Sequence, residues 1–157
     1  MRTENVLSIQ TIERIKRYCA FQDRSEWEVR RRMQQYQFSE KEENKMIDEL
    51  KEANYIDDYR FTKIYVKSKV GYKQWGKRKI REELSHKRID PELIEEFLDS
   101  IPEEEYLNAM RHCIRKWSYT KVMNPLTCVK LYRFLFSKGY EPDLIKEEIK
   151  NFVSANE

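Results

Sequence analysis

The sequence is poor in the residues that interrupt helices, because its 157 residues include only three glycines and four prolines. Tight hairpin turns depend on glycine and proline, so this composition argues against a protein built of β-strands. No apolar run approaches the roughly 20 residues of a membrane-spanning helix, and the first residues lack the apolar core of a signal peptide. We therefore expect an all-α protein in the cytoplasm, with no membrane partner.

Cysteine and histidine are also scarce. The cysteines, Cys19, Cys113 and Cys128, lie far apart and form no Cys-x-x-Cys pair. This pattern favours buried free thiols over a disulfide framework or a zinc site. The two histidines, His86 and His112, have no partners at metal-ligand spacing. We expect neither a metal nor a cofactor.

The chain carries no motif that is typical of an enzyme. It has no glycine-rich phosphate loop, nucleophile elbow or histidine–carboxylate pattern. Asp57 and Asp58 are adjacent acids, but adjacent helical residues point in different directions, and acids are favourable at any helix N-terminus. We therefore predict a protein without catalytic residues.

Charged residues, in contrast, are abundant: they make up 38% of the chain and are unevenly distributed along it. Residues 59–90 carry eleven basic and three acidic side chains, a net charge of about +8. The flanking residues 39–58 and 91–105 carry about −5 and −7. We predict that the basic middle contacts a polyanion through its eleven cations, which are Arg60, Lys63, Lys67, Lys69, Lys73, Lys77, Arg78, Lys79, Arg81, Lys87 and Arg88.

Helix start signals recur along the chain. Ser25 and Ser39 are each followed three residues later by glutamate, which is the spacing of a capping box. Asp90 and Glu141 each precede a proline, which is favoured at the first helical position. Gly139 is placed to end a helix. These signals predict a chain of short amphipathic helices.

The aromatic residues among the lysines allow two interpretations. In the segment 55–72, helical spacing predicts a packed face that includes Phe61, Ile64 and Tyr72. Tyr72 and the nearby Trp75 could stack on nucleic-acid bases, although packing between helices is the favoured interpretation.

Cations in the first turn of a helix are mildly unfavourable beside the positive end of the helix dipole. We therefore attribute three of them to binding rather than to folding, namely Lys77, Arg78 and Arg81.

Apolar residues repeat at an offset of about 51 residues, which predicts tandem repeats. We expect three three-helix repeats at residues 9–54, 55–101 and 102–157, which follow a loose leader at residues 1–8. Such repeats would form an elongated, curved array. The matching positions are Val29, Met33 and Phe38, then Ile80, Leu84 and Ile89, then Leu131, Leu135 and Tyr140.

Several short runs carry a family resemblance. They are RSEWEV at 24–29, YIDDYRF at 55–61, GKRKIREEL at 76–84 and KGY at 138–140. Together, in this order, they resemble the RecX family of regulatory proteins over residues 12–152. Gln37 and Arg88 stand where the resemblance would place glycine, as at Gly139, and Thr62 stands where alanine is more typical.

The resemblance implies a small bacterial protein that binds the RecA recombinase filament on single-stranded DNA, and we expect this protein to be a monomer. Such a protein restrains RecA in DNA repair, recombination and the SOS response, and it could also bind DNA directly. Two rivals remain open at this point. One is a stand-alone nucleic-acid-binding protein, and the other is a helical-repeat scaffold for protein partners.

Overall fold

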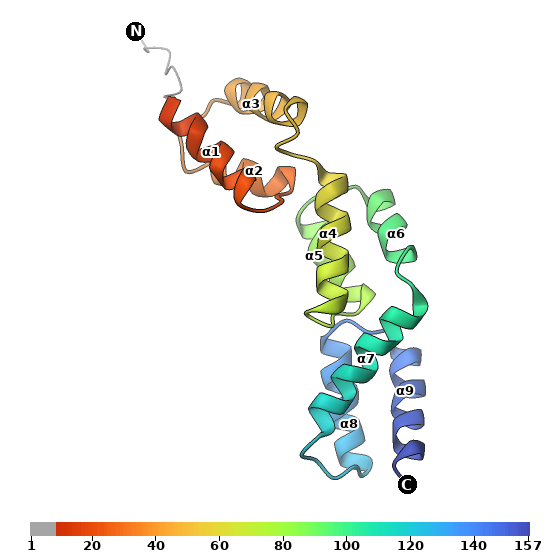
Figure 1. Cartoon of the computed structure of the whole chain (residues 1–157). Coiled ribbons are helices and arrows are strands. Elements are labelled where there is room, and N and C mark those ends of the chain that lie inside the picture. Colours follow the sequence, from red (N-terminus) through yellow and green to blue (C-terminus); the bar gives the residue numbers. More distant parts are fainter. Residues whose placement is uncertain (1–8) are drawn as a thin grey trace. The chain divides into compact units, whose positions relative to one another are not determined.

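The computed structural model describes residues 9–157, which form nine α-helices and no strand (Figure 1). The all-α prediction is confirmed. The leader predicted for residues 1–8 lies outside the described residues. The helices are α1 (Ile9–Phe21), α2 (Glu26–Met33), α3 (Glu40–Glu52), α4 (Asp58–Gly71), α5 (Lys77–His86), α6 (Pro91–Asp99), α7 (Glu103–Ser118), α8 (Pro125–Ser137) and α9 (Pro142–Ala155). In the described part, no helix is long and apolar enough to cross a membrane.

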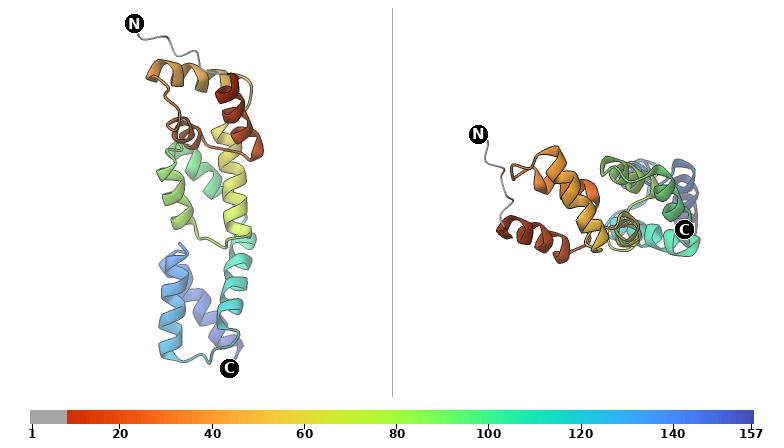
Figure 2. Two further views of the ribbon diagram at one scale, coloured as in Figure 1. Left: turned by 90° about the vertical axis from the view of Figure 1, so that its left-hand side faces the viewer. Right: turned by 90° about the horizontal axis from the view of Figure 1, so that it is seen from above.

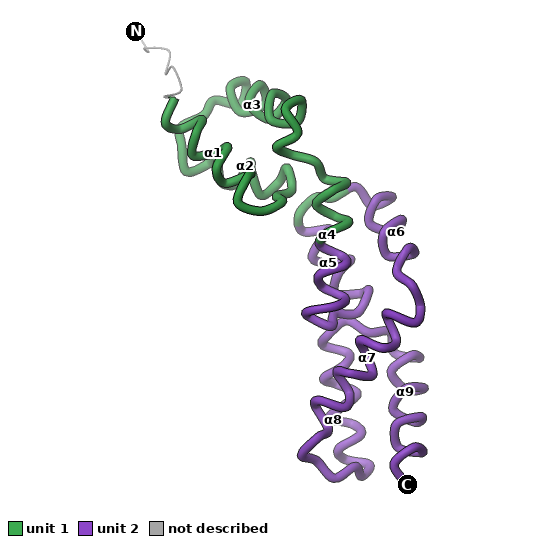
Figure 3. The backbone as a smooth tube through the Cα atoms, viewed as in Figure 1, with its two compact units in different colours: residues 1–64, 87–89 green, residues 65–86, 90–157 purple. Residues whose placement is uncertain are grey.

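The chain divides into two compact units (Figure 3). Unit 1 holds the residues up to Ile64 together with Lys87–Ile89, and unit 2 holds Tyr65–His86 together with Asp90–Glu157. The border falls inside α4. The division into three repeats and the elongated shape stay predictions.

Unit 1 packs around α1, α2 and α3. Both predicted capping boxes are present, at the starts of α2 and α3. The Glu28 amide donates to Ser25 Oγ at 3.2 Å, and the Ser25 amide donates to Glu28 Oε2 at 2.8 Å. The α2 residues Val29 and Met33 are fully buried, as the repeat pattern predicts. The core is completed mainly by Ile15, Cys19, Met46, Ile47, Leu50 and Ile56.

Unit 2 holds α5 to α9, of which α8 and α9 lie side by side (Figures 1 and 2). Asp90 caps α6 by accepting a hydrogen bond from the Glu92 amide at 2.8 Å. Glu141 precedes α9 without making a side-chain cap. The apolar positions predicted for this unit are buried, namely Ile80, Leu84, Leu131, Leu135 and Tyr140.

The packed face of α4 differs from the predicted one. Phe61 is buried, but Ile64 and Tyr72 are 48% and 89% exposed. The helix instead buries Thr62 with two valines spaced four residues apart, Val66 and Val70. Thr62 fits there because its hydroxyl donates to the Asp58 carbonyl at 2.7 Å, which satisfies its polar group. The prediction that Ile64 and Tyr72 pack inward is therefore wrong.

The three cysteines are free thiols. Cys19 and Cys113 are buried as predicted, and burial raises the pKa of the Cys19 thiol to about 11. Cys128 is only half-buried, so the prediction of burial is wrong for that residue. It lies in the first turn of α8, before the first buried residue of that helix, Leu131.

Candidate functional site

The structure divides the eleven predicted cations between the two units. Unit 1 holds Arg60, Lys63, Lys87 and Arg88. Unit 2 holds the other seven, which are Lys67, Lys69, Lys73, Lys77, Arg78, Lys79 and Arg81.

In unit 1, two of the four cations stabilise the unit itself. Arg60 Nε donates to Asp23 Oδ1 at 2.5 Å. Lys87 Nζ lies 3.0 Å from Glu28 Oε1, and both side chains are less than one-fifth exposed. Lys63 and Arg88 are exposed and have no ion-pair partner among the described residues. Only those two are therefore available to an external anion.

In unit 2, two lysines lie against one indole ring. The Nζ atoms of Lys69 and Lys79 lie 4.7 and 4.4 Å from the centroid of the half-buried Trp75 ring. Lys69 Nζ also lies 5.0 Å from the Tyr65 ring. Cation–π attraction holds an ammonium group on an aromatic face without neutralising its charge. Within the described residues no carboxylate pairs with Lys79, so this cluster retains positive charge.

The start of α5 is capped by a distant part of unit 2. Its first amides find acceptors around the turn Lys138–Tyr140 and on Tyr106. The Gly76 amide donates to the Lys138 carbonyl at 2.7 Å, and the Lys77 amide donates to the Tyr106 hydroxyl at 2.9 Å. The Arg78 amide donates to the Gly139 carbonyl at 3.0 Å. Because these donors are occupied, the N-terminus of α5 does not offer them to a phosphate group.

The three cations attributed above to binding have contacts inside the unit. Lys77 Nζ lies 5.1 Å from the Tyr106 ring. The Arg78 guanidinium lies 4.0 Å from the Phe136 ring and donates to the Tyr140 carbonyl at 3.3 Å. Arg81 donates two hydrogen bonds to the Glu95 carboxylate of α6, which raises the pKa of Arg81 and lowers the pKa of Glu95. The prediction that folding gives no reason for these cations is therefore wrong, because the dipole argument leaves out tertiary partners.

The remaining cations of unit 2 define a surface at the end of α4 and the start of α5. Lys67 and Lys73 are exposed, and neither has an ion-pair partner in the part of the chain that the structure describes. Tyr72, in the same connection, is 89% exposed. We name this set the α4–α5 surface, and it consists of Lys67, Lys69, Tyr72, Lys73, Trp75 and Lys79. It combines exposed positive charge with aromatic rings, a combination that suits a nucleic acid strand.

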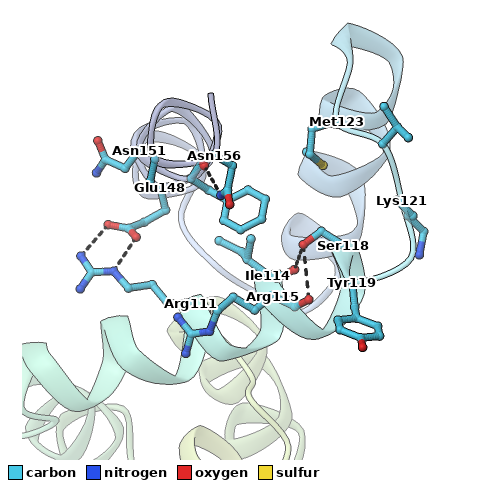
Figure 4. Close-up of a pocket in the computed structure, with 13 residues that line it drawn as sticks. Arg111, Ile114, Arg115, Ser118, Tyr119, Lys121, Met123, Glu148, Asn151 and Asn156 are labelled. Carbon is cyan, nitrogen blue, oxygen red and sulfur yellow. Dashed lines mark hydrogen bonds and ion pairs between the residues drawn. The ribbon is translucent and has the colours of Figure 1, made fainter.

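A separate groove of about 820 Å³ lies between the end of α7 and α9. Figure 4 shows Arg111 facing Glu148 across this groove, whereas Tyr119 and Lys121 point away from it. Arg111 donates to both carboxylate oxygens of Glu148, at 2.7 and 3.1 Å. Glu148, whose side chain is 5% exposed, is not among the residues predicted from the sequence. Its signal was its place beside Ile145 and Ile149 on the buried stripe of α9.

None of these residues forms a metal site. The described residues hold no group of three or more His, Cys, Asp and Glu side chains that could bind a metal ion. The chemistry of the α4–α5 surface is therefore that of cations and aromatic rings.

The structure resembles solved structures of known proteins. A crystal structure of regulatory protein RecX shares 21% sequence identity, covers 90% of this chain with 70% of its own, and gives a TM-score of 0.77. A crystal structure of RecX from Lactobacillus salivarius gives a TM-score of 0.76 over 89% of this chain and 92% of its own. At this level of identity, the two comparisons establish the fold.

Sequence comparisons establish the family. The family model for the second three-helix domain of RecX matches residues 57–98. The regulatory protein RecX of Clostridium botulinum (strain Eklund 17B / Type B) is 34% identical over 94% of this chain and 67% of its own length. That of Legionella pneumophila (strain Corby) is 28% identical over 79% of this chain and 82% of its own.

These matches define a family of regulatory proteins whose second three-helix domain corresponds to residues 57–98. The chain belongs to the RecX family. Its alignment covers 63% of the RecX protein of a second Clostridium botulinum strain, so it spans about two thirds of the length of these two relatives.

Proposed function

We propose that this protein binds the RecA filament on single-stranded DNA and inhibits the recombinase, without catalysing a reaction itself. It would do so in the cytoplasm, during DNA repair and recombination. Support comes from the family, whose members are named regulatory proteins. The proposed contact is with the DNA backbone and the acidic parts of the filament.

The observation that carries the proposal is the α4–α5 surface. Among the described residues, Lys67 and Lys73 are exposed without ion-pair partners, and Lys79 lies on the Trp75 ring without an ion-paired carboxylate. Scattered lysines on helices contact phosphates without reading sequence, and such binding is sensitive to salt. That property suits a partner which coats DNA of any sequence.

The test is RecA-dependent ATP hydrolysis on single-stranded DNA, measured while this protein is titrated in. We expect inhibition that weakens as salt concentration rises. The double variant Lys67→Glu/Lys73→Glu should need about tenfold more protein for half-maximal inhibition. No inhibition at an excess of the unaltered protein would contradict the proposal.

A matched control uses Lys41 and Lys45 of α3, which are also exposed and without ion-pair partners among the described residues. Lys41→Glu/Lys45→Glu changes the net charge by the same about four units, so general electrostatics acts equally in both variants. An equal loss of inhibition in both would remove the α4–α5 surface from the proposal. Binding to bare DNA as tight as to the filament would favour a stand-alone nucleic-acid-binding protein. Indifference to salt would favour a protein scaffold.

A further inference from the structure

Helix α8 is apolar on two sides. Leu131 and Leu135 face the core and are fully buried. Three further large apolar residues, Leu126, Val129 and Phe136, are 65%, 47% and 40% exposed. They are spaced by three and seven residues and so share a second side of the helix. A helix that packs on one side normally presents polar residues on the other, so this second apolar side of α8 is unusual. Its Phe136 ring carries the Arg78 guanidinium, whereas Leu126 and Val129 remain largely exposed.

This second side continues into a groove between α8 and α9. The groove has a volume of about 580 Å³. Val129 and Tyr132 of α8 line it together with Ile149 and Val153 of α9. The Tyr132 ring stacks on the Phe136 ring at 6.2 Å, which extends the apolar surface along α8. The groove therefore offers a mainly aliphatic floor along two adjacent helices.

The lining of the groove is positively charged. Arg133 of α8 and Lys146 and Lys150 of α9 line it, and its lining includes no acidic residue from the described part of the chain. None of these three cations forms an ion pair with another described residue. Buried or paired cations serve folding, whereas unpaired cations beside an apolar floor are free to contact an anionic partner.

We propose that the α8–α9 groove binds an acidic segment of a partner protein that carries apolar side chains at helical spacing. The aliphatic floor removes those apolar side chains from water, and the three cations match carboxylates on either side of them. A nucleic acid strand fits less well, because bases stack on aromatic faces, whereas Val129, Ile149 and Val153 line the groove and the Tyr132 ring is already stacked on the Phe136 ring. A two-fold dimer through this groove would bring the same three cations of each copy together, which is repulsive.

This groove is a second surface, and its use does not rest on the proposed contact of the α4–α5 surface with the filament. A peptide assay without DNA or RecA tests it alone. If the peptide does not bind the groove, the proposed inhibition of RecA is unaffected. If RecA is not inhibited, the proposed binding of an acidic segment in the groove is likewise unaffected.

The probe is a fluorescein-labelled peptide of about 16 residues, with leucine at positions i, i+3, i+4 and i+7 and glutamate at most others. Fluorescence anisotropy with the full chain should show saturable binding that weakens with salt. A peptide of the same leucine pattern with lysine in place of glutamate should not bind. A scrambled acidic peptide should bind at least about tenfold more weakly.

Cys128 supplies a second readout, because its half-buried thiol lines the groove. The bound peptide should slow the reaction of Cys128 with N-ethylmaleimide. Cys19 and Cys113 are buried and react slowly in any case. Mass spectrometry after a short reaction locates the modified residue.

Two variants should each lower the affinity for the peptide by about tenfold, namely Lys146→Glu/Lys150→Glu and Val129→Asp. All three side chains are exposed, so folding should be kept, and circular dichroism checks this. The control is Lys116→Glu/Lys130→Glu, which reverses two exposed cations of unit 2 outside the groove. It should change the affinity by less than about twofold.

Four outcomes would overturn the proposal. The first is an equal loss of affinity in the control variant. The second is a deoxythymidine oligonucleotide that displaces the peptide as tightly as unlabelled peptide does. The third is self-association of the protein that Val129→Asp abolishes, and the fourth is a bound peptide that leaves Cys128 reactivity unchanged.

Discussion

The turns Lys87–Ile89 and Lys138–Tyr140 lie 51 residues apart and share one backbone form. In each, the middle residue is left-handed, with φ of 56° at Arg88 and 97° at Gly139, and the next residue is buried. Their contacts differ. The first turn meets α2 through a side chain, the Lys87 ion pair with Glu28, whereas the second meets α5 through the backbone carbonyls of Lys138 and Gly139.

Glycine accounts for the difference. A Cβ atom on Gly76 would lie 2.1 Å from the Gly139 carbonyl carbon, and one on Gly139 would lie 2.4 Å from Lys79 Cβ. Two glycines therefore allow the backbones to approach until they share hydrogen bonds. At the matching positions stand Ser25 and Arg88, and there α2 caps itself with its own serine and glutamate. A helix with a local capping box needs no backbone cap from elsewhere.

The largest expected effect comes from adding a methyl group at this contact. Gly76→Ala should reduce the free energy of unfolding by about 3 kcal/mol, because the clash is with backbone that cannot rotate away. Urea denaturation followed by circular dichroism measures it. Gly71→Ala is the control, since its Cβ meets nothing within 4 Å, and it should be neutral or slightly stabilising. Equal stability of the two variants would show that the contact is not close.

A second comparison concerns Arg60 and Arg111, which are also 51 residues apart. Each pairs with one carboxylate, but the Asp23 partner of Arg60 is 30% exposed, whereas the Glu148 partner of Arg111 is 5% exposed. Arg111→Ala leaves a buried carboxylate unpaired and should cost about 2 kcal/mol. Arg60→Ala should cost less than about 1 kcal/mol. Thermal unfolding compares the stabilities of the two variants. A greater loss of stability in Arg60→Ala would contradict the expectation that the Arg111–Glu148 pair contributes more.

Tyr106 and Tyr55 form a third matched pair. The Tyr106 hydroxyl accepts from the Lys77 amide and donates to Glu141 Oε2 at 2.7 Å, and its burial raises its pKa. Tyr106→Phe removes the acceptor of a helix amide and should cost about 1.5 kcal/mol. Tyr55→Phe, at a half-buried ring that packs on the unit 1 core, should cost less than about 0.5 kcal/mol. The hypothesis of a tertiary cap fails if the two values agree.

Features with a local cause could be predicted from the sequence. The capping boxes at Ser25 and Ser39 and the cap at Asp90 depend on residues two or three positions away, and all three are present. The buried positions of α2, α5 and α8 follow from helical spacing alone. The prediction of the buried face of α4 was wrong because it favoured a tyrosine and an isoleucine over a threonine. The hydroxyl of that threonine is satisfied by a hydrogen bond within the helix.

Features with a distant cause could not be predicted. Arg78 donates to the Tyr140 carbonyl 62 residues away, and Arg111 pairs with Glu148 37 residues away. Charge counting located the basic stretch, but it could not separate cations that hold the fold, such as Arg81, from exposed ones such as Lys67. That separation depends on which carboxylates and rings the fold brings near each side chain.

A smaller and opposite effect on stability is expected at Arg88, whose matching position 51 residues further on holds Gly139. A left-handed residue other than glycine is strained by about 1 kcal/mol, and glycine relieves that strain. Glycine also gives the unfolded chain more conformational freedom, which offsets about half of the gain. Arg88→Gly should therefore stabilise the protein by about 0.5 kcal/mol. Asn54→Gly, at φ of 61°, should gain less, because asparagine tolerates this conformation. Urea denaturation of both variants measures the difference.

The same substitution tests whether the arginine serves binding. Arg88 is exposed and has no ion-pair partner among the described residues, so removing its side chain breaks no ion pair there. If it contacts phosphates or the filament, Arg88→Gly should weaken filament binding about threefold while it raises stability. Arg88→Lys keeps both the charge and the strained backbone, so it should bind as the unaltered protein does. If Arg88→Gly raises stability and leaves filament binding unchanged, Arg88 does not belong to the candidate cations. The strain of its backbone would then serve no binding function.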